Sequence, residues 1–150
     1  MKNPNQQEHL SEYQQVATCA IIKKQDKYLV AQRSSNMKYP LKWEFPGGRL
    51  EAHETLEECV IREIKEELGV GIEIIEYWGS AESLDPVYPL HLHGYFCRIT
   101  NGIPRCIEHQ EVKWLKLEEL KSLSWAKSDL YFVNKLITKA LDSTNKCNGV

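Results

Sequence analysis

The stretch "PGGRLEAHETLEECVIREIKEELGV", residues 46–70, contains the strongest helix signals in the chain. Thr55 followed three residues later by Glu58 forms a capping box, which predicts a helix that begins at about Thr55. Gly69 is suited to be its C-terminal cap. The apolar stripe that this helix would bury repeats every four residues and consists of Leu56, Val60, Ile64 and Leu68.

Three glutamates, Glu63, Glu66 and Glu67, share one side of this helix, within an arc of about 100°. The arc adjoins the apolar stripe, so we expect partly buried carboxylates, and Arg62 and Lys65 lie off its centre. Carboxylates near a core destabilise a fold unless a cation compensates them, and oxygen ligands suit Mg²⁺ or Mn²⁺. Mg²⁺ also tends to share its coordination shell with substrate phosphates. The spacing therefore predicts a metal–phosphate site, and the alternative is an ordinary solvated helix face.

Length and composition limit the other possibilities. A chain of 150 residues with 27% charged and 42% apolar residues predicts one ordinary globular domain. A net charge of -2 provides no long-range attraction to a nucleic-acid polymer or an anionic membrane, and no apolar run approaches the roughly 20 residues of a membrane helix. The polar N-terminus lacks the apolar core of a signal peptide. An odd number of cysteines with no CxxC pair indicates reduced thiols in a cytoplasmic protein: Cys19, Cys59, Cys97, Cys106 and Cys147.

Strand and helix patterns surround the central helix. Apolar and β-branched runs predict strands at residues 16–24, 27–33, 42–45, 71–83, 90–100 and 111–117. Further helices are predicted at 117–123 and 127–141, and the glycine pair at 47–48 is predicted to form a tight turn. We expect a flexible leader at 1–14, a single domain at 15–141 and a C-terminal tail at 142–150. This order of elements predicts the α/β (α+β) class, with a mixed β-sheet sandwiched between α-helices.

The spacing within residues 48–70 also matches a known family. Gly48, five residues, Glu54, seven residues and then "REIKEELGV" from Arg62 resemble the Nudix box at every defined position. The segments "VAQR", "WEFPGGRLE", "LHLHGYF", "EHQEVKW" and "LSWAKSDL" are similar to the MutT-like branch of this family, including its CTP pyrophosphohydrolase-like members. The resemblance covers residues 16–136 and implies the Nudix fold, in which the box forms a loop–helix–loop.

The resemblance to MutT-like enzymes implies Mg²⁺- or Mn²⁺-dependent cleavage of a nucleoside triphosphate, by attack at the β-phosphorus, to a monophosphate and pyrophosphate. Such enzymes sanitise the nucleotide pool. By the motif match, the catalytic and ion-holding groups are Gly47, Glu63, Glu66, Glu67 and Glu108. Glu63 and Glu108 both remain candidates for the general base, and the alternative for Glu108 is an ordinary loop acid. The box positions that the resemblance implies to be structural are Gly48, Glu54, Arg62 and Gly69.

The resemblance places the nucleotide base outside the box. Phe45 would pack near the base, and Asp129 in "WAKSDL" would hydrogen-bond it. A carboxylate accepts from an amine such as that of cytosine, and a protonated carboxyl can donate to a purine carbonyl, so (d)CTP-type and 8-oxo-dGTP-type substrates both remain open. Asp129 is equally suited to cap the last helix, and this chain has Lys127 and Tyr131 where many relatives have proline.

Several other side chains have two readings each. Arg33 and Arg49 are candidates for phosphate binding, and each can instead be a surface cation. His91 and His93 share a face of one predicted strand and could line the cleft, but no third ligand for a zinc site is evident. Core packing is expected for the tryptophans, Trp43, Trp78, Trp114 and Trp125.

Two other functions compete with the first. A different Nudix substrate, such as ADP-ribose or a dinucleoside polyphosphate, is suggested by Pro86 and Tyr88, which lie sixteen and eighteen residues past the box. A non-catalytic module that only binds nucleotides is opposed by the retained box glutamates. The expected partner is a small-molecule nucleotide rather than a nucleic-acid polymer or a membrane, and monomer and homodimer both remain open.

Overall fold

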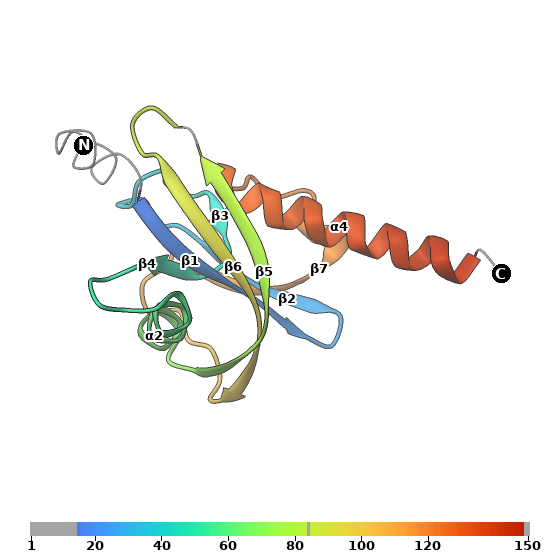
Figure 1. Ribbon diagram of the computed structural model, residues 1–150, viewed down its shortest axis with the longest axis horizontal. Coiled ribbons are helices and arrows are strands. Elements are labelled where there is room, and N and C mark those ends of the chain that lie inside the picture. Colours follow the sequence, from blue (N-terminus) through green and yellow to red (C-terminus); the bar gives the residue numbers. More distant parts are fainter. Residues whose placement is uncertain (1–14, 84, 149–150) are drawn as a thin grey trace, which may run out of the picture.

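One mixed β-sheet lies between helices on its two faces (Figure 1). The computed structural model describes residues 15–83 and 85–148, with side chains described as far as residue 144, so the predicted leader at 1–14 lies outside the described residues. The strands are β1 (Gln15–Lys24), β2 (Lys27–Gln32), β3 (Trp43–Glu44), β4 (Gly47–Arg49), β5 (Gly71–Ser83), β6 (Leu90–Asn101) and β7 (Glu111–Lys116). The helices are α2 (Leu56–Leu68), α3 (Leu117–Leu120) and α4 (Lys127–Asn148).

Strand β1 is central to the sheet. The strand order is β3-β2-β1-β6-β5, with β4 paired to β1 and β7 paired to β2. β1 and β6 run parallel from Gln15 to Ile22 of β1, and all the other paired strands are antiparallel. Strands β4 and β2 share one edge of β1: residues 17–19 of β1 pair with β4, and residues 23–24 pair with β2. The expected mixed sheet between helices is confirmed.

Side chains on the two faces of β1 enter two separate cores. Cys19 and Ile21 belong to the core on the α4 side, and Ala20 and Ile22 belong to the core on the α2 side. Because both faces of β1 are covered, its sequence is a continuous apolar run, without the alternation of apolar and polar residues that a strand with one solvated face shows. The core on the α4 side also buries three of the four tryptophans, as expected: Trp43, Trp78 and Trp125. Trp114 is partly buried against the other core.

Helix α2 begins and ends as predicted. Thr55 Oγ1 accepts a hydrogen bond from the backbone N–H of Glu58 at 3.1 Å, so Thr55 is the N-cap. Gly69 adopts a left-handed conformation with a φ of 70° and donates its N–H to the Lys65 carbonyl at 3.0 Å. Val60 is fully buried within the stripe, so the helix is fixed in rotation as well as in length.

The two C-terminal helices differ from their predicted bounds. α3 ends at Leu120, whose carbonyl accepts both the Leu123 N–H at 3.3 Å in a turn and the indole N–H of Trp125 at 2.8 Å. α4 continues past the predicted end at Leu141 to Asn148, because the segment predicted as a tail contains neither glycine nor proline before that point. No helix in the described residues combines the length and the apolar character that crossing a membrane requires.

Candidate active site

The glutamates of α2 differ in their exposure to solvent. Glu67 is 5% exposed, whereas the side chains of Glu63 and Glu66 are 15% and 52% exposed. At about 100° per residue, Glu67 lies about 60° from Ile64 in the buried stripe, Glu63 about 100° and Glu66 about 160°. The expected partial burial is therefore confirmed for Glu63 and Glu67, and it is wrong for Glu66, which lies almost opposite the stripe.

Glu67 is a buried carboxyl group that lacks a cationic partner within the described residues. Its Oε2 accepts a hydrogen bond from the Gly47 N–H at 3.1 Å. Burial, together with the carboxylates of Glu44, Glu63 and Glu108, raises the pKa of Glu67 to about 10. An ionised Glu67 at neutral pH therefore requires a positive charge from outside the described part of the chain.

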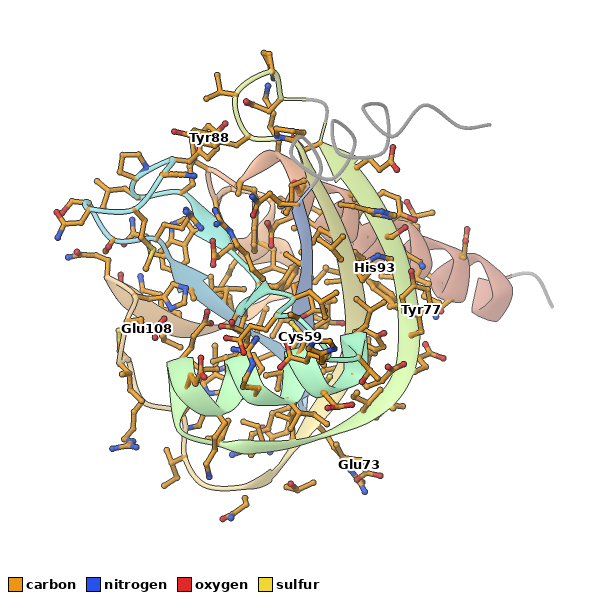
Figure 2. All side chains as sticks on the ribbon, turned by 60° about the vertical axis from the view of Figure 1, so that its left-hand side comes forward. Cys59, Glu73, Tyr77, Tyr88, His93 and Glu108 are labelled. Carbon is orange, nitrogen blue, oxygen red and sulfur yellow. The ribbon has the colours of Figure 1, made fainter. Side chains whose placement is uncertain are left out.

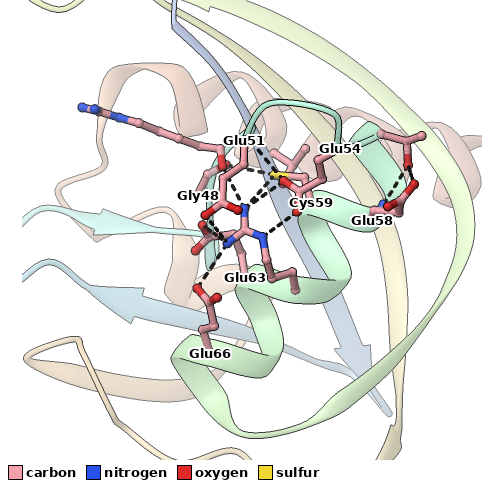
Figure 3. Close-up of polar contacts among 11 residues, drawn as sticks. Gly48, Glu51, Glu54, Glu58, Cys59, Glu63 and Glu66 are labelled. Atoms are coloured by element: carbon pink, nitrogen blue, oxygen red, sulfur yellow. Dashed lines mark hydrogen bonds and ion pairs between the residues drawn. The ribbon is translucent and has the colours of Figure 1, made fainter.

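Arg62 collects four carboxylates around one guanidinium (Figure 3). Its nitrogens lie 2.5 Å from Glu54, 2.8 Å from Glu63, 3.2 Å from Glu66 and 3.6 Å from Glu51. The sequence placed Arg62 off the centre of the glutamate arc, but its long side chain spans the helix surface. The hydrogen bond from Arg62 lowers the pKa of Glu54 to about 2 and joins the loop before α2 to the helix.

Strand β4 packs closely against this acidic cluster because its first two residues are glycines. A Cβ added to Gly47 would collide with the backbone of Thr18 and Cys19 on β1. A Cβ added to Gly48 would collide with the carboxylate of Glu63. The predicted tight turn is therefore wrong, since the glycine pair forms an extended strand that β1 and α2 approach too closely for side chains.

Glu108 approaches the same cluster from a different element. It lies exposed on the loop between β6 and β7, near α2 (Figure 2). Its charge contributes to the raised pKa values of both Glu63 and Glu67, for which burial is the largest cause. The structure therefore brings together the four glutamates that the resemblance implies.

Glu44 and His109 are candidate site residues that the sequence pattern does not predict. Glu44, on β3, lies 2.5 Å from Arg33 Nη1 and 3.2 Å from His109 Nε2. Arg33 is thus held by a carboxylate instead of being an isolated surface cation. The one signal in the sequence was a charged residue between the two aromatic residues of "WEF", because a carboxylate in such a place must find a partner.

A cavity of about 410 Å³ extends from β4 to the N-terminus of α4. Phe45, Asp129 and the glycine pair of β4 line it, together with the basic residues Arg33, Lys38, Lys42, Arg49 and Lys127. Its size is typical of a small-molecule site. A concave site with apolar walls and several cations, beside an acidic cluster, suits a ligand with a planar base and several phosphates.

Asp129 lies in the first turn of α4, which begins at Lys127, so the alternative in which Asp129 is the N-cap does not hold. The buried carboxylate accepts a hydrogen bond from the Phe45 N–H at 2.8 Å. Burial, with the neighbouring charge of Glu44, raises the pKa of Asp129 well above its usual range. Asp129 therefore fixes Phe45 and presents at the cavity wall a buried carboxyl group that holds a proton more strongly than an exposed aspartate does.

His91 and His93 lie on the face of β6 that points away from this cavity. Leu90 and Leu92 line the cavity, and alternation along the strand turns both histidines to the opposite face. There the two imidazole rings lie 4.3 Å apart, and His93 Nδ1 lies 2.8 Å from the Tyr77 hydroxyl (Figure 2). Of the two alternatives for these histidines, lining the cleft does not hold for this cavity.

The oxygen donors suit a hard divalent cation. The strongest indication of a cation site is Glu67, because its buried carboxyl group needs a nearby cation to ionise at neutral pH. No three His, Cys, Asp or Glu side chains of the described residues are arranged to bind one ion, and Arg62 contacts Glu63 and Glu66. Ion binding by these residues therefore requires their side chains to rearrange from the positions that they occupy here.

Comparisons with known proteins agree with this arrangement. The model of the NUDIX domain family matches residues 12–136. A CTP pyrophosphohydrolase of Escherichia coli (strain K12) is 32% identical over 111 residues, which are 74% of this chain and 82% of that protein. An 8-oxo-dGTP diphosphatase of Buchnera aphidicola subsp. Acyrthosiphon pisum (strain APS) is 29% identical over 94 residues, 63% of this chain and 76% of that protein.

A solved structure has the same fold. The crystal structure of a MutT NUDIX hydrolase from Burkholderia pseudomallei superposes with a TM-score of 0.75, at 24% identity, over 81% of this chain and 96% of that chain. The family match includes the sheet, the box helix and the first turns of α4, and the box retains the glutamates that gather beside β4. On these grounds the chain belongs to the NUDIX domain family, and it is a Nudix hydrolase that acts on nucleotide derivatives.

Proposed function

We propose that this Nudix hydrolase is a Mg²⁺-dependent pyrophosphohydrolase that converts a nucleoside triphosphate to a monophosphate and pyrophosphate. The observation that carries the proposal is the buried Glu67 carboxyl group, which has no cationic partner among the described residues and accepts the N–H of Gly47 on the cavity wall. The basic side chains of the same cavity favour a ligand with several negative charges. The relatives named for CTP and 8-oxo-dGTP favour a triphosphate.

Each group of the site has a role in this reaction. The residues that would hold the ion are Gly47, Glu63, Glu66, Glu67 and Glu108. Bound Mg²⁺ would neutralise phosphate charge and make a water molecule more acidic. Arg49 would contact the phosphates, and Glu63 or Glu108 would accept the proton of the attacking water. Burial raises the pKa of Glu63, which makes its carboxylate a stronger proton acceptor than an exposed glutamate.

The base would lie against Phe45 and Asp129. A protonated Asp129 can donate to an acceptor on the base edge and accept from a neighbouring donor. Cytosine and 8-oxoguanine both carry such adjacent groups, so the proposed substrates are (d)CTP-type nucleotides and 8-oxo-dGTP. In this role the enzyme would sanitise the nucleotide pool of the cytoplasm. A cytoplasmic location is supported by the free thiols of Cys19, Cys59, Cys97 and Cys106, because the cytoplasm keeps thiols reduced.

A substrate panel tests the reaction. The panel contains 8-oxo-dGTP, dCTP, CTP, 5-methyl-dCTP, dGTP and ADP-ribose, each with Mg²⁺, and follows monophosphate and pyrophosphate release. We expect kcat/KM for at least one triphosphate to exceed that for ADP-ribose by roughly 100-fold or more. A preference for ADP-ribose would contradict the triphosphate assignment. Tight nucleotide binding without turnover would instead support a binding-only module.

Asp129→Ala tests the base contact. We expect this variant to change the ratio of kcat/KM between CTP and 8-oxo-dGTP by roughly tenfold, since it removes a group that bonds the base and not the phosphates. Asp129→Asn is the matched control for folding, because an amide oxygen can still accept the Phe45 N–H. If the ratio is unchanged in a folded Asp129→Ala protein, Asp129 does not contact the base.

A further inference from the structure

His109 has a buried ring with an unusual set of contacts. Its side chain is 1% exposed, and Nε2 lies 3.2 Å from Glu44 Oε2. An ionised carboxylate can only accept, so Nε2 donates to Glu44. Nδ1 is the one buried side-chain nitrogen or oxygen of the described residues without a hydrogen-bond partner. A buried nitrogen without a partner destabilises a fold. We therefore look for the contribution of His109 in the contact between its Nε2 and Glu44.

The backbone around His109 is fixed as well. The Cys106 thiol lies 3.0 Å from the His109 carbonyl, within hydrogen-bond reach. The Gln110 N–H donates to the Gln32 carbonyl at the end of β2, at 2.9 Å. Together with the ring, these contacts fasten residues 106–110 to β2 and β3.

Glu108 is the residue that this segment carries to the acidic cluster. It is exposed and forms no hydrogen bond or ion pair with any other described residue. It nevertheless lies near enough to Glu63 and Glu67 for its charge to act on both. Carboxylates repel each other when they are ionised, and no described contact of Glu108 itself opposes this repulsion, so a loop that was free to move would carry Glu108 away. Its place beside α2 therefore depends on its neighbours in the loop.

We propose that His109 is a positioning residue, whose buried ring, bonded to Glu44, holds Glu108 beside Glu63 and Glu67. The inference rests on the proposed function, in which Glu108 takes part in ion binding. His109 touches neither the ion nor the substrate in this scheme. It links β3, through Glu44, to the loop between β6 and β7, so that the acidic cluster receives a carboxylate from outside α2.

The test uses Mn²⁺ alone as the probe, with the free ion measured by electron paramagnetic resonance. His109→Leu fills the space without a donor, and we expect it to weaken Mn²⁺ binding roughly tenfold. His109→Gln supplies an amide donor that can reach Glu44, and we expect it to recover most of this loss. Gln110→Leu is the matched control: it changes the next, exposed residue, and its Mn²⁺ affinity should equal that of the wild type.

Thermal unfolding separates positioning from a purely structural role. If His109→Leu lowers the Tm and leaves Mn²⁺ affinity unchanged, while Glu108→Gln weakens binding, the proposal is overturned. Equal losses in His109→Gln and His109→Leu would also overturn it, because the donor would then be irrelevant. If His109→Leu does not fold, His109→Asn, which is too short to reach Glu44, takes its place. Failure of the proposed function would be seen separately, as a wild-type protein that neither binds Mn²⁺ nor hydrolyses a triphosphate.

Discussion

Glu67→Gln is expected to lower kcat by roughly 10³-fold while leaving the protein folded. The amide has nearly the shape of the carboxyl group and can still accept the Gly47 N–H, so the local packing remains. It cannot provide the negative charge that an ion requires. Pyrophosphate release at saturating Mg²⁺ measures the effect, and Glu118→Gln, an exposed glutamate on α3, is the control for loss of one charge.

The same change is expected to stabilise the ion-free protein at neutral pH. The fold raises the pKa of Glu67 from an ordinary value of 4.5 to about 10. Between these values the folded protein keeps a proton that the unfolded chain releases, so wild-type stability falls as the pH rises. Glutamine removes this dependence. In EDTA, the Tm of Glu67→Gln should therefore exceed that of the wild type, by about 2–4 °C for each kcal/mol added to the free energy of unfolding. The difference in Tm should be larger at pH 8 than at pH 6.

Added Mg²⁺ should reverse this order. The ion binds the ionised carboxylate of the folded wild type and raises its Tm, whereas the glutamine variant should respond weakly. Full turnover in Glu67→Gln, or a Tm below that of the wild type in EDTA, would contradict the role assigned to this carboxyl group.

Among the variants proposed for this protein, Gly47→Ala is expected to lose the most stability, about 2–3 kcal/mol in the free energy of unfolding or roughly 5–10 °C in Tm. The new methyl group would meet the backbone of Thr18 and Cys19, and β1 cannot move aside without disturbing both cores. Chemical denaturation and calorimetry measure this loss.

Gly48→Ala provides the matched comparison. Its methyl group would meet the end of the Glu63 side chain, which can rotate away. We expect its Tm to remain near that of the wild type while kcat falls roughly tenfold or more, because the displaced carboxylate belongs to the ion site. If the two alanine variants lose the same stability, the distinction between a backbone contact and a side-chain contact at β4 is wrong.

The box helix could be predicted closely because its signals are local. The cap at Thr55, the stripe and Gly69 act within a few residues of each other, and no distant contact alters them. The glycine pair was misjudged for the same reason. Pro-Gly-Gly favours a turn when it is considered alone, but pairing with β1 determines the strand.

The parts of the site that depend on distant contacts could not be predicted. Glu44 and His109 are 65 residues apart in the chain, and neither has a local pattern that indicates the other. Arg62 was placed correctly on the helix, yet the reach of its side chain to Glu66 depends on rotamers and not on angular position. Asp129 was selected as a base contact, but its bond to Phe45 required the packing of α4 on the sheet.

That bond between Asp129 and Phe45 spans 84 residues and has a consequence for biosynthesis. The box glutamates are encoded before residue 70, whereas the wall that receives the base needs the start of α4. A ribosome-bound chain whose last helix has not yet emerged therefore has the box but lacks a complete cavity. Nucleotide could assist folding only after the start of α4 has been synthesised, so the nascent protein must assemble its sheet without help from its ligand.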